Sequence, residues 1–243
     1  MIDYSEIIHP ARINILKAIS EESKSLKDIA TLLKISRPEV SRHLTTLRNQ
    51  DLVKKNASVN SITTLGSLIL RILDPLDFIL AHYDFFKDHQ LLNFPSEYLL
   101  GLNKLIKSQY IVGTGFVFQK VIEVAKYAPK TMKLLINSPI PNVSGVRYKL
   151  GYIVVPNSAT EELNNPERLS QDFMHYEFRK YPEVNHSIFI IGDQYGFLKF
   201  ANKEGMPDNN SCFYVEDKEG MAFLLDLWDY YWTNSTFFFQ NEK

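Results

Sequence analysis

The distribution of aromatic residues divides this chain of 243 residues into two unlike parts. Of its 16 phenylalanines, 13 tyrosines and 2 tryptophans, only Tyr4 precedes residue 67. Residues 1–66 also carry a net charge of +3, whereas residues 67–243 carry −4. Because aromatic side chains bury large areas and dominate the cores that contain them, the two parts need different cores. We expect a small basic module followed by a larger acidic one.

The remaining composition excludes several protein classes. Hydrophobic residues make up 45% of the chain and charged residues 23%, which is ordinary for a soluble globular protein. The single cysteine, Cys212, rules out an internal disulfide and a multi-cysteine zinc site. The N-terminus has no signal-peptide pattern, and no apolar run approaches the roughly 18 residues of a membrane span. We therefore expect a cytoplasmic protein without a cofactor or membrane contact.

Three short helical patterns follow one another in the basic module. Pro10 suits the first turn of a helix, and apolar residues recur after it at a spacing of three. Ser25 and Ser36 are each followed three residues later by an acidic residue, Asp28 and Glu39. This is the pattern of a capping box, so a new helix is predicted to begin after each serine.

The face of the third helix that points away from its apolar stripe is polar and basic. Val40, Leu44 and Leu47 recur at helical spacing and form a narrow core-facing stripe. The other face carries arginines and short hydroxyl groups, which suit a major groove because arginine pairs with guanine there. We predict DNA contacts from Ser36, Arg37, Pro38, Ser41, Arg42, His43, Thr45 and Thr46.

A basic hairpin is predicted directly after this helix, from two short alternating segments around a turn over 56–60. Lys54, Lys55 and Asn56 at its base would lie over DNA phosphates. The alternative is that these lysines and the arginines form only the solvated face of a helical bundle. The order of two short helices, a tight turn, a polar-faced helix and a basic hairpin favours a DNA-binding module over residues 1–66.

The segment Ile35–Leu44 (ISRPEVSRHL), followed by Leu47 and Asp51-Leu52-Val53, resembles the recognition helix of ArsR/MarR-like winged helix-turn-helix regulators. His9-Pro10-Ala11-Arg12 resembles the opening of the same domain, and the similarity covers about residues 5–73. The resemblance implies a DNA-binding transcription regulator. Metal-sensing members of this superfamily use paired cysteine ligands, and because this module has no cysteine, thiolate metal sensing is not implied.

An apolar repeat joins the two modules. From Leu65 to Phe86 apolar residues alternate spacings of four and three, a pattern typical of a seam between helices. Asp74-Pro75 interrupts the repeat and predicts that a second helix begins there. The repeat predicts a two-fold dimer contact in a helical linker over 67–94, with packing onto the second module as the alternative. The predicted dimer residues are Ile69, Ile72, Leu76, Ile79 and Tyr83.

Helical and strand patterns alternate over residues 95–243, which predicts a mixed domain of the α/β or α+β class. Strands are expected over 132–136, 148–155, 186–191, 195–201 and 211–215, and helices over 116–128, 160–173 and 218–232. The chain as a whole is predicted to be a winged helix-turn-helix, a helical linker and a C-terminal mixed α/β domain.

Two parts of the second module resemble the C-terminal domain of archaeal methanogenesis regulatory proteins. They are Phe85–His89 with Phe94-Pro95, and the closing segment over 223–232. In that family a winged helix precedes a domain related to the phospholipase D-like fold. The resemblance implies an archaeal one-component transcription regulator, and it does not imply methanogenesis as the process controlled.

A phospholipase D-type active site needs a histidine nucleophile and a lysine at His-x-Lys spacing, and no such pair occurs in the chain. His175, Glu177 and His186 match no metal-ligand spacing and are interpreted as strand-surface residues. We predict that the protein is not an enzyme. The alternative is a phosphodiesterase-like enzyme with a DNA-targeting head.

These observations together predict a sequence-specific transcription regulator that binds double-stranded DNA as a homodimer on an inverted repeat. The C-terminal module would sense a small-molecule effector or mediate dimerisation. Its many aromatic residues would line an apolar effector pocket or simply fill a core, and no residue is assigned as an effector ligand.

Overall fold

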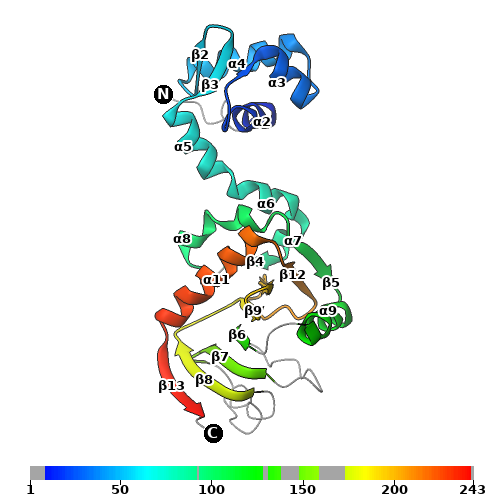
Figure 1. Ribbon diagram of the computed structural model, residues 1–243, viewed down its shortest axis with the longest axis vertical. Coiled ribbons are helices and arrows are strands. Elements are labelled where there is room, and N and C mark those ends of the chain that lie inside the picture. Colours follow the sequence, from blue (N-terminus) through cyan, green and yellow to red (C-terminus); the bar gives the residue numbers. More distant parts are fainter. Residues whose placement is uncertain (1–8, 92, 128–130, 138–147, 159–172, 242–243) are drawn as a thin grey trace. The chain divides into compact units, whose positions relative to one another are not determined.

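The computed structural model describes residues 9–91, 93–127, 131–137, 148–158 and 173–241 (Figure 1). The chain forms two compact units, Met1–Pro75 and Leu76–Lys243. The first unit therefore extends beyond residue 66, where the change in composition predicted its boundary, and it includes about the first third of the predicted linker.

Helices and a small sheet alternate in the first unit. In chain order its elements are α2 (Pro10–Ala18), β1 (Lys24–Ser25), α3 (Leu26–Leu33), α4 (Arg37–Asn49), β2 (Val53–Asn56), β3 (Val59–Ile62) and α5 (Thr64–Leu73). The sheet has the order β1-β3-β2, and β2 pairs with β3 as an antiparallel hairpin. This is the winged helix-turn-helix predicted from the sequence, with a hairpin turn shorter than the predicted one over 56–60.

Side-chain caps begin the helices where the sequence predicts them. The Ser25 hydroxyl accepts a hydrogen bond from the backbone N–H of Asp28 at 3.2 Å, and Ser36 accepts one from Glu39 at 3.3 Å. Lys34 adopts a left-handed conformation with φ of 54° and ends α3. The chain therefore reverses between α3 and α4 within a few residues, as a helix-turn-helix requires.

Aliphatic side chains form the core of the first unit. Its most deeply buried members are Ile15, Leu16, Ile29, Val40, Leu44, Leu47 and Leu52. Helix α5 joins this core through Leu70, which is buried. Gly66 at the start of α5 lies against the backbone of Leu52, where any Cβ atom would collide with the carbonyl oxygen. This close approach explains why α5 belongs to the first unit.

An eight-stranded mixed sheet forms the centre of the second unit. Its strands are β5 (Gln109–Val112), β6 (Thr131–Leu135), β7 (Tyr148–Pro156), β8 (Phe173–Tyr181), β9 (Ser187–Ile191), β10 (Tyr195–Lys199), β12 (Ser211–Val215) and β13 (Thr236–Asn241). Their order is β13-β8-β7-β6-β9-β10-β12-β5, with β6, β7 and β8 parallel and the other neighbours antiparallel. A small two-stranded sheet pairs β4 (His89–Gln90) with β11 (Ala201–Asn202).

Helices cover both faces of the large sheet. Helix α9 (Thr114–Tyr127) packs on one face, and α11 (Lys218–Thr233) packs on the other. The short helices of the unit are α6 (Pro75–Ala81), α7 (Tyr83–Lys87), α8 (Ser96–Leu99) and the 3-10 helix η1 (Leu102–Leu105). In β9, Phe189 and Ile191 face the α9 side, while Ile188 and Ile190 face the α11 side. Burial on both faces explains why β9 reads as a continuous apolar run.

Most predicted elements of the second unit coincide with observed ones. The five predicted strands correspond to β6, β7, β9, β10 with β11, and β12, and two predicted helices correspond to α9 and α11. The helix predicted over 160–173 lies outside the described residues except for Phe173, which begins β8. Strands β5, β8 and β13 were not predicted, since β5 is short and β13 lies at a sheet edge. Helix α5 ends at Leu73 and α6 begins at Pro75, as the Asp74-Pro75 break predicted.

Candidate nucleic-acid interface

Helix α4 presents the polar face that the sequence predicts. Val40, Leu44 and Leu47 are buried in the core, which fixes the rotation of the helix. The residues left exposed at its N-terminus and along its outer face are Ser36, Arg37, Pro38, Ser41, Arg42 and Thr45, and Thr46 is half-buried. The aliphatic core thus orients seven of the eight predicted contact residues of this helix toward its surface.

The two arginines on this face have no ionic partner among the residues that the structure describes. Neither the Arg37 nor the Arg42 guanidinium forms an ion pair with another residue in the described part of the chain. The hydroxyl groups beside them are partly occupied: Thr45 Oγ1 donates to the Ser41 carbonyl at 2.9 Å and accepts from Arg48 at 3.0 Å. Both guanidinium groups are therefore available to an external anion or base edge.

The structure contradicts one predicted contact residue, His43. Its side chain is only 3% exposed, and its ring lies 4.8 Å from the ring of His9, which caps α2. Burial, and then the positive charges of His9, Arg12 and Arg42, lower the pKa of His43. The residue lies at the edge of the apolar stripe, and the start of α2 covers it. His43 therefore packs α2 against α4 and does not reach the surface.

The wing residues lie on the exposed side of the hairpin. Lys54, Lys55 and Asn56 are all exposed on β2 and pair with Ser61, Asn60 and Val59 of β3. The buried Asn60 amide donates to the carbonyl of Lys24 at 3.3 Å and so fastens β3 to β1. The hairpin is therefore held to β1 through the half next to its turn, opposite Lys55 and Asn56.

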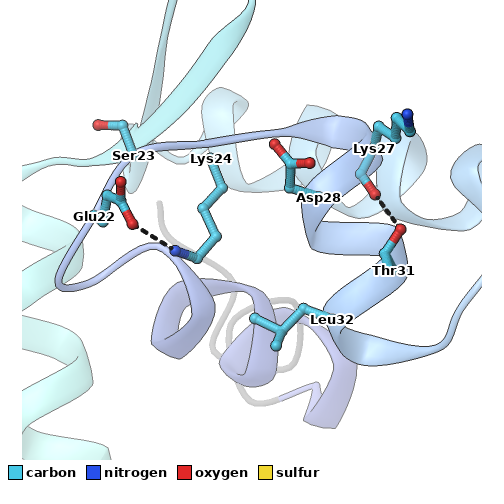
Figure 2. Close-up of a pocket in the computed structure, with 7 residues that line it drawn as sticks. All are labelled: Glu22, Ser23, Lys24, Lys27, Asp28, Thr31 and Leu32. Atoms are coloured by element: carbon cyan, nitrogen blue, oxygen red, sulfur yellow. Dashed lines mark hydrogen bonds and ion pairs between the residues drawn. The ribbon is translucent and has the colours of Figure 1, made fainter.

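A shallow hollow of about 550 Å³ lies beside the N-terminal end of α3, and the sequence analysis did not predict it (Figure 2). Residues Glu22, Ser23, Lys24, Lys27, Asp28, Thr31 and Leu32 line it. Lys24 and Glu22 form an ion pair across 3.2 Å at one end. Because acidic and basic groups alternate around the hollow, it shows no preference for an anionic or a cationic ligand.

The predicted dimer residues do not form one exposed face. Ile72, Leu76 and Tyr83 are exposed, at 61%, 37% and 58%, but Ile69 packs against the core of the first unit and Ile79 against that of the second. The apolar residues exposed on α5 are instead Leu65, Leu68 and Ile72. Their spacing of three and four places them on one side of the helix. This exposed apolar face of α5 shares only Ile72 with the predicted set of dimer residues.

The histidines and acids considered for catalysis lie on β8 and just before β9: His175 and Glu177 are half-buried two positions apart on β8, and His186 precedes β9. Glu177 pairs with Arg179 at 2.7 Å, and His186 is buried against Phe94 and Tyr231 rather than lying on a strand surface. Among the described residues, no group of three or more histidine, cysteine, aspartate or glutamate side chains could hold a metal ion. No described helix combines the length and the apolar character needed to cross a bilayer.

The chain was compared with known families and structures. Residues 9–55 match the model of the bacterial regulatory protein arsR family, which supports the resemblance of the winged domain. No curated protein is significantly similar to the chain. The solved structure of TrmBL2, an archaeal chromatin protein, is 13% identical, with a TM-score of 0.39, and the similarity covers 96% of this chain and 95% of that one.

Two further solved structures cover part of the chain. Nuc from Salmonella typhimurium, a phospholipase D family member, is 13% identical with a TM-score of 0.39, covering 54% of this chain and 99% of that one. HlyU from Vibrio cholerae is 23% identical with a TM-score of 0.27, covering 30% of this chain and 81% of that one. At these scores, none of the three structures superposes closely on the chain.

Proposed function

We propose that the protein is a DNA-binding transcription regulator that reads sequence with α4 and contacts the DNA backbone with its wing. The observation that carries the proposal is the exposed face of α4, where Arg37 and Arg42 lie beside short hydroxyl groups and form no ion pair within the described part of the chain. An α-helix fits the major groove, and arginine there pairs with guanine through two hydrogen bonds. The match of residues 9–55 to the arsR family supports the same function.

The wing supplies the part of the affinity that does not depend on sequence. Lys54 and Lys55 are exposed at the base of a hairpin that follows α4 directly. Ammonium groups in this position neutralise phosphates and release condensed counterions. Asn56, at the end of the same strand, adds an amide for phosphate oxygens. The helix specifies the site, and the wing holds the head on the duplex.

We further propose that the protein acts as a two-fold dimer on an inverted repeat. A single winged head with few basic residues makes few phosphate contacts, so high affinity needs two heads. Two heads in successive major grooves lie about 34 Å apart. The exposed apolar face of α5, formed by Leu65, Leu68 and Ile72, is the surface in the first unit that fits a second copy.

The second unit takes the role of an effector-sensing or oligomerising domain in this proposal. No catalytic role is proposed for it, because a phosphodiesterase of the phospholipase D type would need the His-x-Lys pair that the sequence lacks. Turnover of bis-p-nitrophenyl phosphate by rigorously purified protein would support the enzyme instead.

The proposal is tested by selecting bound sequences from random duplex DNA with the full chain, followed by affinity measurements on the selected site. We expect one preferred site with an inverted repeat. Arg42→Ala should weaken binding by about 1–3 kcal/mol, since it removes a bidentate base contact. Arg71→Ala, an exposed arginine on α5, is the matched control and should bind normally. Selection without any sequence preference, or equal affinity of the Arg42→Ala variant, would overturn the proposal.

A further inference from the structure

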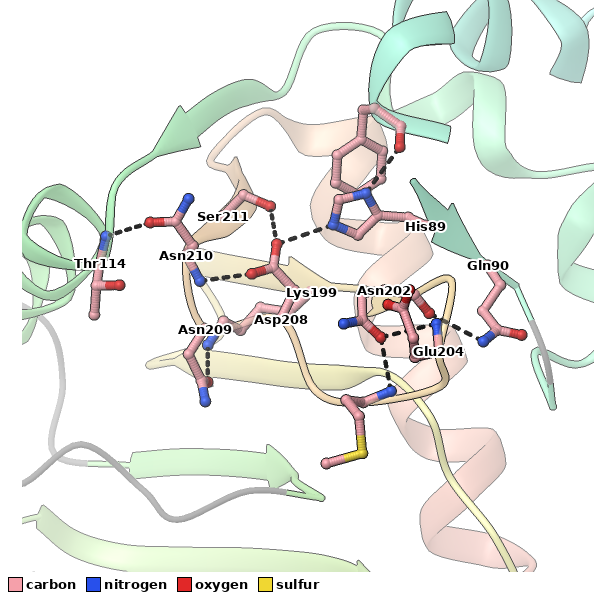
Figure 3. Close-up of polar contacts among 12 residues, drawn as sticks. His89, Gln90, Thr114, Lys199, Asn202, Glu204, Asp208, Asn209, Asn210 and Ser211 are labelled. Atoms are coloured by element: carbon pink, nitrogen blue, oxygen red, sulfur yellow. Dashed lines mark hydrogen bonds and ion pairs between the residues drawn. The ribbon is translucent and has the colours of Figure 1, made fainter. Parts of the chain in front are cut away.

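Hydrogen bonds within the fold determine which parts of a polar side chain remain for a ligand. In the second unit, Figure 3 shows a cluster in which Asp208 accepts from the Ser211 hydroxyl and, at 2.7 Å, from the Asn210 backbone N–H, while its Oδ2 atom lies 3.0 Å from His89 Nε2. A cluster of this kind ties distant segments of the fold together. The exposed face of α4 differs, because there the fold occupies one part of a side chain and leaves another part free.

Thr45 lies on this face, and its hydroxyl group is engaged within the helix. Its Oγ1 atom donates to the Ser41 carbonyl at 2.9 Å and accepts from Arg48 Nη2 at 3.0 Å. A hydroxyl has one hydrogen and two lone pairs, so this one keeps no donor and a single lone pair. The bond from the guanidinium is charge-assisted and therefore stronger than a bond between neutral groups. The two bonds together fix the hydroxyl of Thr45 along the helix.

The methyl group of Thr45 is the part of the side chain that these bonds leave unoccupied. The residue is exposed, and its Cβ atom carries only the hydroxyl and this methyl group. In the major groove thymine is the base that presents a methyl group, and the methyl group of a threonine makes apolar contact with it. A side chain already held in one rotamer also loses less conformational entropy when it binds. Thr45 is therefore suited to apolar recognition of thymine.

The position of Thr45 relative to Arg42 limits where this thymine lies in the bound site. Residues three apart are neighbours on the surface of a helix, and they are separated by about 4.5 Å along its axis. Successive bases of a DNA strand are about 3.4 Å apart along the duplex axis. The thymine is therefore expected close to the guanine that Arg42 is proposed to contact.

We propose that Thr45 recognises the methyl group of a thymine in the major groove, and that Arg48 is the positioning residue that fixes its hydroxyl. The inference rests on the proposed DNA-binding function and names one base of the site. It assigns Arg48 a role that requires no contact between Arg48 and DNA. The alternative is a hydrogen bond from the Thr45 hydroxyl to the DNA, and it predicts the opposite effects when the hydroxyl or the methyl group is removed.

The experiment uses the full chain and the site selected from random duplex DNA, with each thymine replaced in turn by deoxyuridine. Deoxyuridine keeps the base pairing of thymine and lacks only its methyl group. At one thymine near the Arg42 guanine, affinity should fall about fourfold, the effect expected for burial of one methyl-sized group. If the chain selects a site and needs Arg42, yet no replacement lowers its affinity, this inference fails and the proposed function stands. If no site is selected, both fail.

Two variants of Thr45 separate the methyl group from the hydroxyl. Thr45→Val keeps the methyl group and should keep the preference for thymine over uracil, whereas Thr45→Ser keeps the hydroxyl and should bind both sites equally. The matched control is Thr31→Ser on α3, because Thr31 is exposed and its hydroxyl donates to the Lys27 carbonyl at 3.0 Å. This control should keep the preference. Loss of the preference in Thr45→Val, with its retention in Thr45→Ser, would overturn the proposal.

Two variants of Arg48 test its positioning role. Arg48→Met keeps a long side chain and removes the donor to Thr45, so the preference for thymine over uracil should shrink. Arg48→Lys keeps a charged donor and should restore most of the preference. Far-UV circular dichroism checks that each variant keeps its helices. If Arg48→Met weakens binding to the thymine and uracil sites by the same factor, Arg48 contacts the DNA backbone and its positioning role is wrong.

Discussion

The two units of the chain use their polar side chains in opposite ways. In the first unit an aliphatic core turns the polar face of α4 outward, where Arg37 and Arg42 lie exposed. In the second unit aromatic cores cover both faces of a sheet, and polar groups such as Lys199 and His186 lie inside. Helical periodicity is therefore enough to place an exposed polar face, whereas the burial of a polar side chain depends on contacts between segments that are distant in sequence.

Substitutions in the two cores should have the largest effects and should act separately. Leu44→Ala should cost about 2–5 kcal/mol in the first unit, and Phe213→Ala about 3–5 kcal/mol in the second. Trp228 and Trp232 both lie on α11, so tryptophan fluorescence reports unfolding of the second unit. Phe213→Ala should lower the midpoint of that fluorescence transition, while Leu44→Ala should abolish DNA binding and leave the transition unchanged. Equal shifts in both variants would mean that the units unfold together.

The exposed face of α5 provides the next test. A Leu68→Asp, Ile72→Asp variant places two charges on the proposed dimer contact, so we expect light scattering to show a monomer and DNA affinity to fall steeply. Arg71→Ala on the same helix should remain dimeric. A wild-type monomer that binds its operator fully, or a dimer that survives the double substitution, would contradict the α5 contact.

Removal of the wing charges should change the salt dependence of binding more than its sequence preference. For Lys54→Ala, Lys55→Ala the slope of log affinity against log salt should flatten by about 1.8, because each phosphate contact contributes about 0.9. Specific and random DNA should lose affinity about equally. The paired control is Lys126→Ala, Lys149→Ala in the second unit, where both lysines are exposed. Loss of specific binding alone would show that the wing reads sequence.

The smallest effect concerns the buried histidine of α4. The pKa of His43 is lowered in the fold by burial and by the positive charges of His9, Arg12 and Arg42, against the opposing charge of Glu39. As pH falls through about 6.5, the unfolded chain takes up a proton that the folded unit excludes, so stability falls. Urea unfolding followed by far-UV circular dichroism at about pH 7.5 and pH 5.5 should show this loss. Identical pH dependence in His43→Leu would contradict the assignment.

Local signals predicted the first unit well because its contacts are local. Ser25 and Ser36 cap helices through residues three positions away, so the capping pattern was sufficient to place α3 and α4. The helical periodicity of α4 gave a wrong prediction for the exposure of His43. A residue at the edge of an apolar stripe is buried only if another element covers it. That cover comes from the start of α2, beside His9.

The second unit was predicted less completely because its decisive contacts are remote in sequence. His89 meets Asp208 across 119 positions, and no spacing rule connects them. Strand β8 was missed because its buried residues Phe173, Tyr176 and Phe178 do not alternate regularly. The apolar repeat of the linker placed Ile69 and Ile79 on a common face, but each packs against the core of its own unit. The side of a helix that is buried depends on the elements packed against it, and not on the spacing of its apolar residues alone.

The pairing of β5 with β12 also has a consequence during protein synthesis. Strand β5, which contains no charged residue, forms an edge of the large sheet, and its only partner among the described strands comes about 100 residues later in the chain. A ribosome that adds 5–20 residues per second would need roughly 5–20 seconds to make that distance. For this time the nascent second unit carries an unpaired, uncharged strand, while the winged head has already emerged complete. Chaperone capture of nascent chains is therefore expected to begin at β5 and to end once β12 is available.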